Sequence, residues 1–211
     1  MNSELKINNE EILLLGLCRL EFSEEHIIKI RALIPLVVDW DYFRFLANAH
    51  GVAALACHNL EKNGLLKSIP GEVVTFLRWT LMISLSRNAF NIESMGEVLR
   101  LLNAENIKTV LLKGLALENI VYGNEGLRQM SDVDILIARE ECIKARNTLL
   151  SNGFISLPVK SVLHQLIIAD AGKHLPSLIK NGASVEIHHA LFGGRQGVRT
   201  RMLNDNRSRL A

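Results

Sequence analysis

The segment SDVDILI, residues 131–137, places two carboxylates at the start of an apolar run. The β-branched and aliphatic side chains from Val133 to Ile137 predict a β-strand, because such side chains favour a pleated, half-buried surface. Side chains at positions i and i+2 of a strand project to the same face of the sheet. The segment therefore predicts that Asp132 and Asp134 lie side by side at one end of a buried strand.

Two carboxylates at such a short distance need a positive partner, since the charge of each disfavours ionisation of the other. Mg²⁺ is commonly held by one or two carboxylates together with substrate phosphates. The pair Asp132 and Asp134 thus indicates metal-dependent phosphoryl or nucleotidyl transfer. Two solvated carboxylates at the entrance of a strand would show the same pattern, so the motif alone leaves both interpretations open.

The residues before this strand have helical apolar spacing and predict an α-helical N-terminal region. Helices are expected at 10–20, 23–33, 39–49, 52–62 and, after Pro70, to about Asn103, with Ser23 and Asp39 as N-caps. A short strand at 108–112 and a helix at 115–122 follow. This order predicts an α+β protein in which a helical region precedes a small α/β domain.

The residues after the strand predict two helices and a hairpin. Helices are expected at 139–150 and 162–169, and strands at 174–180 and 183–191. The two strands are joined by Asn181-Gly182, which is a strong hairpin signal. Together with the two earlier strands, they predict a mixed sheet.

The second strand of the hairpin contains Val185-Glu186-Ile187-His188. By the period of two, Glu186 and His188 share one face of the strand. A third carboxylate on a neighbouring strand is what a two-metal site needs, because one ion aligns the attacking oxygen and the other neutralises the phosphates. An exposed edge residue would explain Glu186 equally well on its own. His188 lies on the Glu186 face, where it is placed to contact a substrate.

Several short motifs resemble the nucleotidyltransferase superfamily named after DNA polymerase beta. They are Lys113-Gly114, Tyr122, Arg128, the segment 131–137 and the segment 185–188. They are more closely similar to a bacterial branch of uncharacterised nucleotidyltransferases, in which a Lys-Gly precedes the Asp-x-Asp and a Glu-x-His strand supplies the third acid. The resemblance covers roughly 39–191 and includes Ala49-His50-Gly51-Val52 and Arg87-Asn88.

The resemblance implies roles for the acidic residues. Asp132 and Asp134 are expected to bind Mg²⁺ or Mn²⁺. Glu186 is expected to complete the site on the metal that activates the acceptor. The implied fold is a nucleotidyltransferase-like α/β domain with a mixed sheet.

The resemblance also implies a nucleotide-binding set. Gly114 would let the backbone approach the triphosphate, and the helix after it would direct its N-terminus at the phosphates. Lys113 stands where many relatives have glycine before a serine or second glycine, and it would act as a point charge on phosphate. Arg128 would brace the loop or contact phosphate, and Ser131 and His188 complete the set.

The implied activity is transfer of a nucleoside monophosphate from an NTP to an acceptor, with release of pyrophosphate. The acceptor is left open among a sugar, a small metabolite, a protein side chain and an RNA end. The alternative is a module of the same fold that binds nucleotide or neutralises a partner protein, as an antitoxin does, without turnover. Pyrophosphate release in the presence of NTP separates these two hypotheses.

Composition predicts a soluble cytoplasmic protein. Hydrophobic residues make up 48% and charged residues 22% of the 211 residues, as in ordinary globular proteins. No apolar run approaches the length of a membrane span, and the polar N-terminus argues against a signal peptide. Three dispersed cysteines are expected to be reduced thiols.

Three regions are expected along the chain: a helical region at 1–105, the catalytic domain at 106–192, and a tail at 193–211. The tail has five arginines and one aspartate, whereas the rest of the chain has 19 basic and 21 acidic side chains. The body therefore lacks a basic signature for nucleic acid. The tail is expected to be disordered or to mark a truncation.

Overall fold

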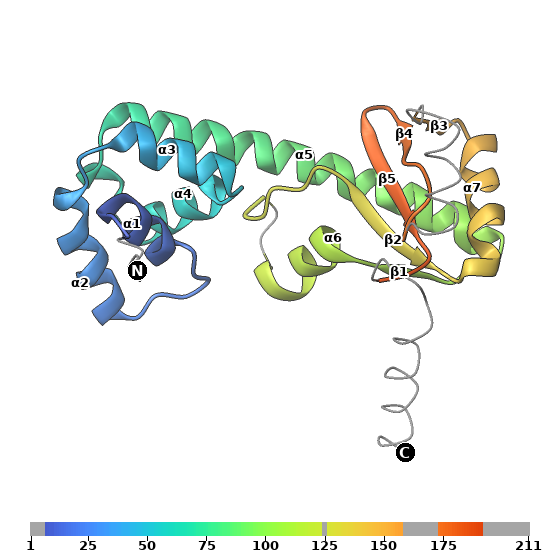
Figure 1. Cartoon of the computed structure of the whole chain (residues 1–211), viewed down its shortest axis with the longest axis horizontal. Coiled ribbons are helices and arrows are strands. Elements are labelled where there is room, and N and C mark those ends of the chain that lie inside the picture. Colours follow the sequence, from blue (N-terminus) through green and yellow to red (C-terminus); the bar gives the residue numbers. More distant parts are fainter. Residues whose placement is uncertain (1–6, 124–125, 158–172, 192–211) are drawn as a thin grey trace, which may run out of the picture. The chain divides into compact units, whose positions relative to one another are not determined.

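The computed structural model describes residues 7–123, 126–157 and 173–191, shown in Figure 1. It contains two compact units. The first, here the helical unit, comprises Met1–Glu93 and Lys113–Ser131. The second, the sheet unit, comprises Ser94–Leu112 and Asp132–Ala211. The domain boundaries predicted at 105 and 192 stay a prediction, because compact units need not coincide with domains. The tail and the helix predicted at 162–169 lie outside the described residues.

The helical unit begins with four capped or turn-linked helices. They are α1 (Asn9–Leu17), α2 (Glu24–Leu33), α3 (Trp40–Ala49) and α4 (Ala53–Lys62), with 3₁₀ turns η1 (Ile34–Leu36) and η2 (Leu66–Ser68). The predicted N-caps are confirmed: Ser23 accepts a hydrogen bond from the His26 amide, and Asp39 accepts one from the Tyr42 amide. Each cap satisfies an amide that has no partner within its helix.

The helix α5 (Gly71–Ala104) is 34 residues long and contributes to both units. It starts directly after Pro70, as predicted, because proline fits just before a helix and not inside one. In the helical unit its first turns bury Val73 and Leu77 in an apolar core with Phe43 of α3 and Leu60 of α4.

The buried face of α5 then changes from apolar to polar. Four polar side chains lie on it at intervals of three or four residues, and we call them the polar stripe: Thr80, Ser84, Asn88 and Asn91. Polar groups inside a protein are almost always hydrogen-bonded, because an unpaired buried group costs free energy. The stripe therefore marks a part of α5 whose neighbours, or ligands, must supply polar partners.

The helix predicted at 115–122 is divided into two kinds of turn. The α-helical part is α6 (Lys113–Leu117), and it continues as the π-helix η3 (Glu118–Tyr122). The π-helix ends at Gly123, which has a left-handed backbone with φ of 59°. Wide π turns often occur near functional sites.

The described residues of the sheet unit form five strands. They are β1 (Thr109–Leu111), β2 (Val133–Ile137), β3 (Ile155–Ser156), β4 (Leu178–Lys180) and β5 (Ala183–His188), in the order β1-β2-β5-β4-β3. The pair β2 and β5 is parallel and the other pairs are antiparallel. The predicted α+β class and mixed sheet are confirmed. The strand β3 was not predicted, and the two strands of the hairpin are shorter than predicted.

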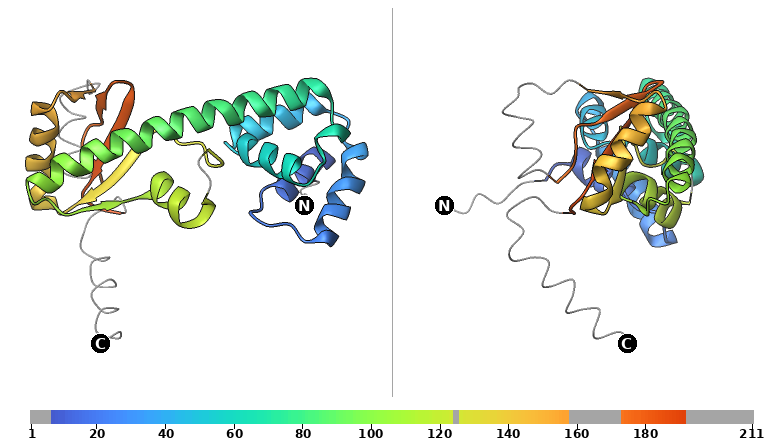
Figure 2. Two further views of the ribbon diagram at one scale, coloured as in Figure 1. Left: turned by 180° about the vertical axis from the view of Figure 1, so that it is seen from behind. Right: turned by 90° about the vertical axis from the view of Figure 1, so that its right-hand side faces the viewer.

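One face of the sheet is apolar. Val133, Ile135 and Ile137 of β2 and Val185 and Ile187 of β5 are buried. The helix α7 (Cys142–Ser151) follows the 3₁₀ turn η4 (Arg139–Glu141), and Figure 2 shows α7 and the last turns of α5 beside the sheet. By strand alternation, Asp134 and Glu186 belong to the opposite face.

None of the helices in the described part of the chain is long and apolar enough to cross a membrane.

Candidate functional site

The parallel pairing of β2 and β5 brings two acidic residues together. Asp134 and Glu186 are direct partners in the strand register. His188 lies two residues beyond Glu186 and therefore on the same face of β5. Asp134 and His188 are buried, whereas the Glu186 side chain is 20% exposed. The strand register thus gathers one accessible and one buried carboxylate with an imidazole.

The histidine lies against both carboxylates. His188 Nε2 is 2.7 Å from Asp134 Oδ1 and 3.4 Å from Glu186 Oε2. Ser177 Oγ donates a hydrogen bond of 3.2 Å to Glu186 Oε1. These contacts orient both carboxylates.

The same three side chains have the geometry of a metal centre. One potential ligand atom from each of Asp134, Glu186 and His188 lies within 4.8 Å of the other two. Two carboxylate oxygens suit Mg²⁺ or Mn²⁺, and an imidazole nitrogen is the softer ligand that Mg²⁺ favours least. The donor set fits a divalent cation bound through the carboxylates, with His188 as a third ligand or as their hydrogen-bond partner.

Asp132 differs from Asp134 in its placement. It precedes β2 and is half-buried. Among the described residues, the group of ligand atoms within 4.8 Å does not include it. The assignment of Asp132 as a metal ligand therefore stays a prediction.

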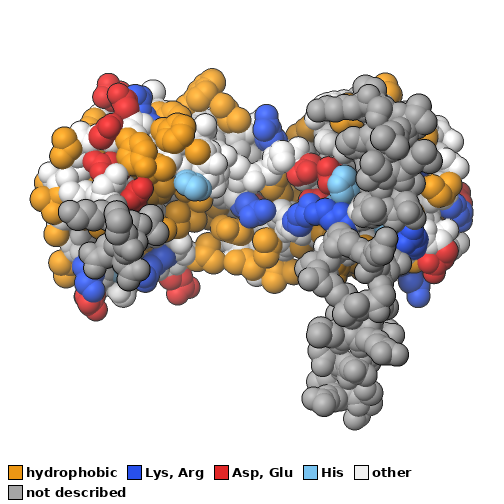
Figure 3. Space-filling model, in the orientation of Figure 1, with side chains coloured by type: hydrophobic (Ala, Val, Ile, Leu, Met, Phe, Trp, Pro, Cys, Tyr) orange, Lys and Arg blue, Asp and Glu red, His pale blue; other side chains and the backbone are white. Residues whose placement is uncertain are grey.

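Two further histidines lie near His188. The rings of His174 and His188 have centroids 5.2 Å apart, and the two residues form an isolated β-bridge. The pKa of His189 is lowered, mainly because burial disfavours its charged form and also because Arg139 and the two other histidines are near. Figure 3 shows acidic side chains next to a histidine on the surface of the sheet unit.

The predicted phosphate-binding residues belong to the helical unit. Lys113 is exposed and has a left-handed φ of 46°, at the junction of β1 and α6. A Cβ atom on Gly114 would lie 2.9 Å from Cγ and Sδ of Met130. A larger residue at this position would therefore force the Met130 side chain to shift. Their contact with phosphate, like that of Arg128 and Ser131, stays a prediction.

Sequence reasoning missed a buried acid in this unit. Glu118 is 3% exposed, and its Oε1 accepts hydrogen bonds from the Gly126 amide at 2.6 Å and from Asn88 Nδ2 at 3.3 Å. Asn88 Nδ2 also donates to the Arg128 carbonyl at 2.8 Å. These bonds fix the segment before the Asp-x-Asp to α5. The sequence signal that could have indicated this buried acid was Asn88, a polar residue within the long helix.

The comparison with curated proteins found no match. A protein-family model described as an uncharacterised nucleotidyltransferase matches residues 37–209. That match spans α3 to β5 and so contains Asp134, Glu186 and His188. The chain belongs to this family of uncharacterised nucleotidyltransferases.

Proposed function

We propose that the protein transfers a nucleoside monophosphate from an NTP to an acceptor oxygen and releases pyrophosphate, with Mg²⁺ or Mn²⁺ as cofactor. The observation that carries this proposal is the pairing of Asp134 with Glu186 across parallel strands, with His188 against both. The family match supports the general class of reaction.

The reaction forms one bond and breaks one bond at the α-phosphorus. The acceptor oxygen bonds to the α-phosphorus, and the bond to the oxygen that bridges to the β-phosphorus breaks. Pyrophosphate leaves with the electron pair of that bond, and an acceptor hydroxyl gives up its proton. A bound divalent cation would act as a Lewis acid on the phosphate oxygens.

The protein's own residues hold and orient the reacting groups in this proposal. Asp134 and Glu186, with Asp132, hold the cation. Ser177 fixes the Glu186 carboxylate on the accessible side of the site. His188 Nε2 lies 2.7 Å from Oδ1 of the buried Asp134 and so holds that carboxylate in one orientation.

A phosphate-binding role is proposed for the residues that flank the turn after β1. Lys113 would place a positive charge on the triphosphate, and Gly114 would allow close approach of the backbone. Asn88 donates a hydrogen bond to the backbone carbonyl of Arg128, which fixes the backbone from which the guanidinium would reach the phosphates. Ser131 would contribute a hydroxyl to the same phosphates.

The three thiols suggest where the reaction takes place. Cys18, Cys57 and Cys142 are free, and two of them are buried. Unpaired buried cysteines are typical of a reducing compartment. We therefore propose the cytoplasm as the location.

The test of the site is coupled binding of metal and nucleotide. In titration calorimetry, Mn²⁺ should strengthen binding of a non-hydrolysable NTP to the wild-type protein, because the cation links the carboxylates to the phosphates. The variant Asp134→Asn should lose this coupling. The matched control Asp41→Asn removes the same charge from an exposed position of α3 and should keep it.

The outcome that contradicts the proposal is undiminished coupling in Asp134→Asn. Turnover is tested separately, by pyrophosphate release from NTP with a panel of sugars, small metabolites, peptides and RNA ends. Coupled binding without release for any acceptor would favour a nucleotide-binding or antitoxin-like module of the same fold.

A further inference from the structure

The polar stripe of α5 leaves one hydroxyl without a partner. Thr80 Oγ1 donates to the Phe76 carbonyl at 2.9 Å. Asn88 and Asn91 donate to the carbonyls of the segment that precedes the Asp-x-Asp, at 2.8 Å and 3.5 Å. Ser84 Oγ is buried and has no hydrogen-bond partner among the described residues. A small polar side chain is thus buried where the fold itself does not use it.

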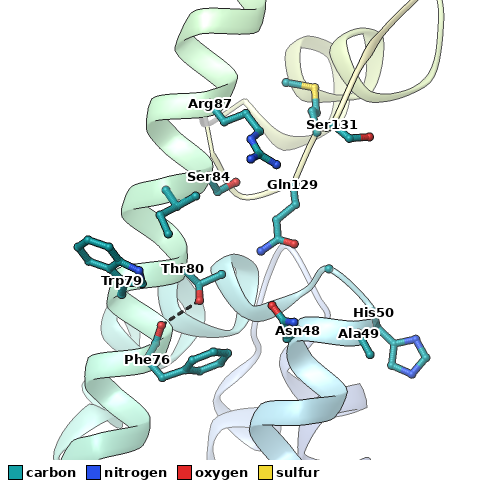
Figure 4. A pocket seen from close by; sticks show the side chains of 13 residues that line it. Asn48, Ala49, His50, Phe76, Trp79, Thr80, Ser84, Arg87, Gln129 and Ser131 are labelled. Atoms are coloured by element: carbon teal, nitrogen blue, oxygen red, sulfur yellow. Dashed lines mark hydrogen bonds between the residues drawn. The ribbon is translucent and has the colours of Figure 1, made fainter. Parts of the chain in front are cut away.

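The unpartnered hydroxyl lines a pocket inside the helical unit. The pocket has a volume of about 610 Å³, which is within the range of small-molecule sites. Its walls are the α3–α4 turn with His50, the middle of α5, and the segment Gln129–Ser131. Figure 4 shows Ser84 and Arg87 on α5 and Gln129 on the segment opposite them.

The electrostatic character of the pocket is positive. Arg87 and His50 are its titratable side chains, and no acidic residue is among those that line it. On the same helix Arg78 forms an ion pair of 3.0 Å with Glu61, whereas no carboxylate pairs with Arg87 in the described part of the chain. A guanidinium without a carboxylate partner is suited to a carboxylate or phosphate group of a ligand.

The pocket also has an aromatic and apolar side. Trp79 is 67% exposed and Ile83 is 44% exposed, and both line the pocket together with Phe76. A planar apolar group is stabilised against such a wall, and a cation at the other end fixes its orientation. The features of the pocket therefore specify an anionic group joined to a planar group.

We propose that this pocket binds a small molecule that carries a carboxylate or phosphate held by Arg87, a polar group that hydrogen-bonds to Ser84, and a planar apolar group beside Trp79. The residues Ala49, His50, Gly51 and Arg87 come from two motifs noted in the sequence and line this pocket, and the metal-binding proposal assigns them no role.

The test uses phenyl phosphate and benzoate as probes, in EDTA so that no metal-bound nucleotide site contributes. Calorimetry should show binding of at least one of these anions to the wild-type protein. Arg87→Gln should weaken it by about 10-fold or more, the effect expected for loss of a hydrogen bond to a charged group. The neutral probe benzyl alcohol should bind at least about 10-fold more weakly. The matched control Arg100→Gln removes another exposed arginine of α5, outside the pocket, and should bind like wild type.

A second variant separates a ligand-binding role from a structural one. Ser84→Ala removes a buried hydroxyl that has no partner, so it should leave the ligand-free protein as stable as wild type or more stable. It should also weaken binding of the anionic probe by about 3-fold to 10-fold. A structural serine would instead lower the thermal midpoint without changing affinity.

Three results would overturn the inference. The first is that neither anion binds to the wild-type protein. The second is that each anion binds equally well to wild type and to Arg87→Gln, and the third is that Arg87→Gln loses as much affinity for Mn²⁺–NTP as for the anion. The last result would mean that the pocket holds the nucleotide itself. Asp134→Asn should still bind the anion, so a failure of the metal-site proposal is distinguishable from a failure of this one.

Discussion

The positions of the three side chains of the candidate metal centre differ in how well they can be predicted from the sequence. Asp134 and Glu186 were placed on strands by local alternation, and their faces follow from the period of two. The contact of His188 with Asp134 at 2.7 Å depends on the parallel pairing of two strands that are 54 residues apart. No local pattern encodes that pairing, so the histidine's position against the buried carboxylate was not predictable.

Glu186 should matter for turnover more than for nucleotide affinity. It is the most accessible of the three side chains, so we expect it to act where the acceptor approaches, and such a contact is made chiefly in the transition state. Glu186→Gln should lower kcat by more than ~100-fold, as is typical for loss of a charge-stabilising or proton-accepting group. The dissociation constant for NTP should stay within a few-fold of wild type.

Pyrophosphate release and NTP calorimetry measure the two quantities for Glu186→Gln. Glu140→Gln is the matched control, because Glu140 is an exposed glutamate of the same unit outside the site. A kcat close to wild type in Glu186→Gln would remove this residue from the site.

Cys57 should make the stability of the protein fall at alkaline pH. Its side chain is fully buried, and burial raises its pKa from 9.0 to about 11. The unfolded chain therefore loses the thiol proton first, and the free energy of unfolding declines as pH rises from about 9 toward 11. The expected contribution is about 1 kcal/mol between pH 7.5 and pH 10.

Urea unfolding of wild type and Cys57→Ala at both pH values isolates this effect, since other groups titrate alike in the two proteins. At pH 7.5 the variant should be less stable because it loses buried apolar volume. At pH 10 that difference should shrink by about 1 kcal/mol. A difference that is the same at both pH values would contradict the raised pKa.

At the scale of elements, prediction succeeded where side-chain pattern and turn chemistry agree. The strand β2 was predicted residue for residue, and the start of α5 after Pro70 was also correct. The strand β3 has two residues, too few to show alternation, and its ladder depends on pairing with β4. The π-helical turn η3 was missed because Glu118 is held by the Gly126 amide and Asn88, which are distant in sequence.

The hairpin turn at Asn181-Gly182 should lose stability when its glycine is replaced. Asn181 and Gly182 both have positive φ, 52° and 95°, which side chains with a Cβ rarely adopt. The turn sets the register of β5 and so the face on which Glu186 lies. Gly182→Ala should lower the free energy of unfolding by about 1–2 kcal/mol.

The matched control for this turn is Gly96→Ala. Gly96 lies inside α5, its φ is negative, and a Cβ atom there would have no heavy atom within 4 Å. The same substitution should therefore stabilise by about 0.5–1 kcal/mol, because alanine favours a helix over glycine. Urea unfolding followed by circular dichroism measures both changes. Effects of the same sign would show that backbone strain at the turn is not the cause.

At the scale of the whole molecule, the two compact units are interleaved along the chain, and each is built from two separate segments. The chain passes between the two units at 93–94, 112–113 and 131–132. The first passage lies inside the unbroken helix α5. The residues after β1 return to the helical unit, while the predicted domain boundaries at 105 and 192 stay a prediction. The predicted site residues are divided accordingly, with Lys113 to Ser131 in one unit and Asp132 onward in the other.

This interleaving should make the two units unfold together. Unfolding of the sheet unit would release the end of α5 and both ends of the segment 113–131, which the helical unit needs. Both tryptophans, Trp40 and Trp79, belong to the helical unit. The proposed metal–nucleotide ligands Asp134 and Glu186 belong to the sheet unit. Tryptophan fluorescence therefore reports on one unit, while Mn²⁺ binds to residues of the other.

With Mn²⁺ alone at about 100 times its dissociation constant, binding should add about 2.7 kcal/mol to the free energy of unfolding. The urea midpoint followed by fluorescence should rise by the same amount as the midpoint followed by circular dichroism. Asp134→Asn should abolish both shifts of the urea midpoint, since it removes a proposed ligand through which the bound metal stabilises the folded protein. A fluorescence transition that stays fixed while a second dichroism transition moves would mean that the sheet unit gains stability alone. The continuous α5 would then join two units that unfold independently.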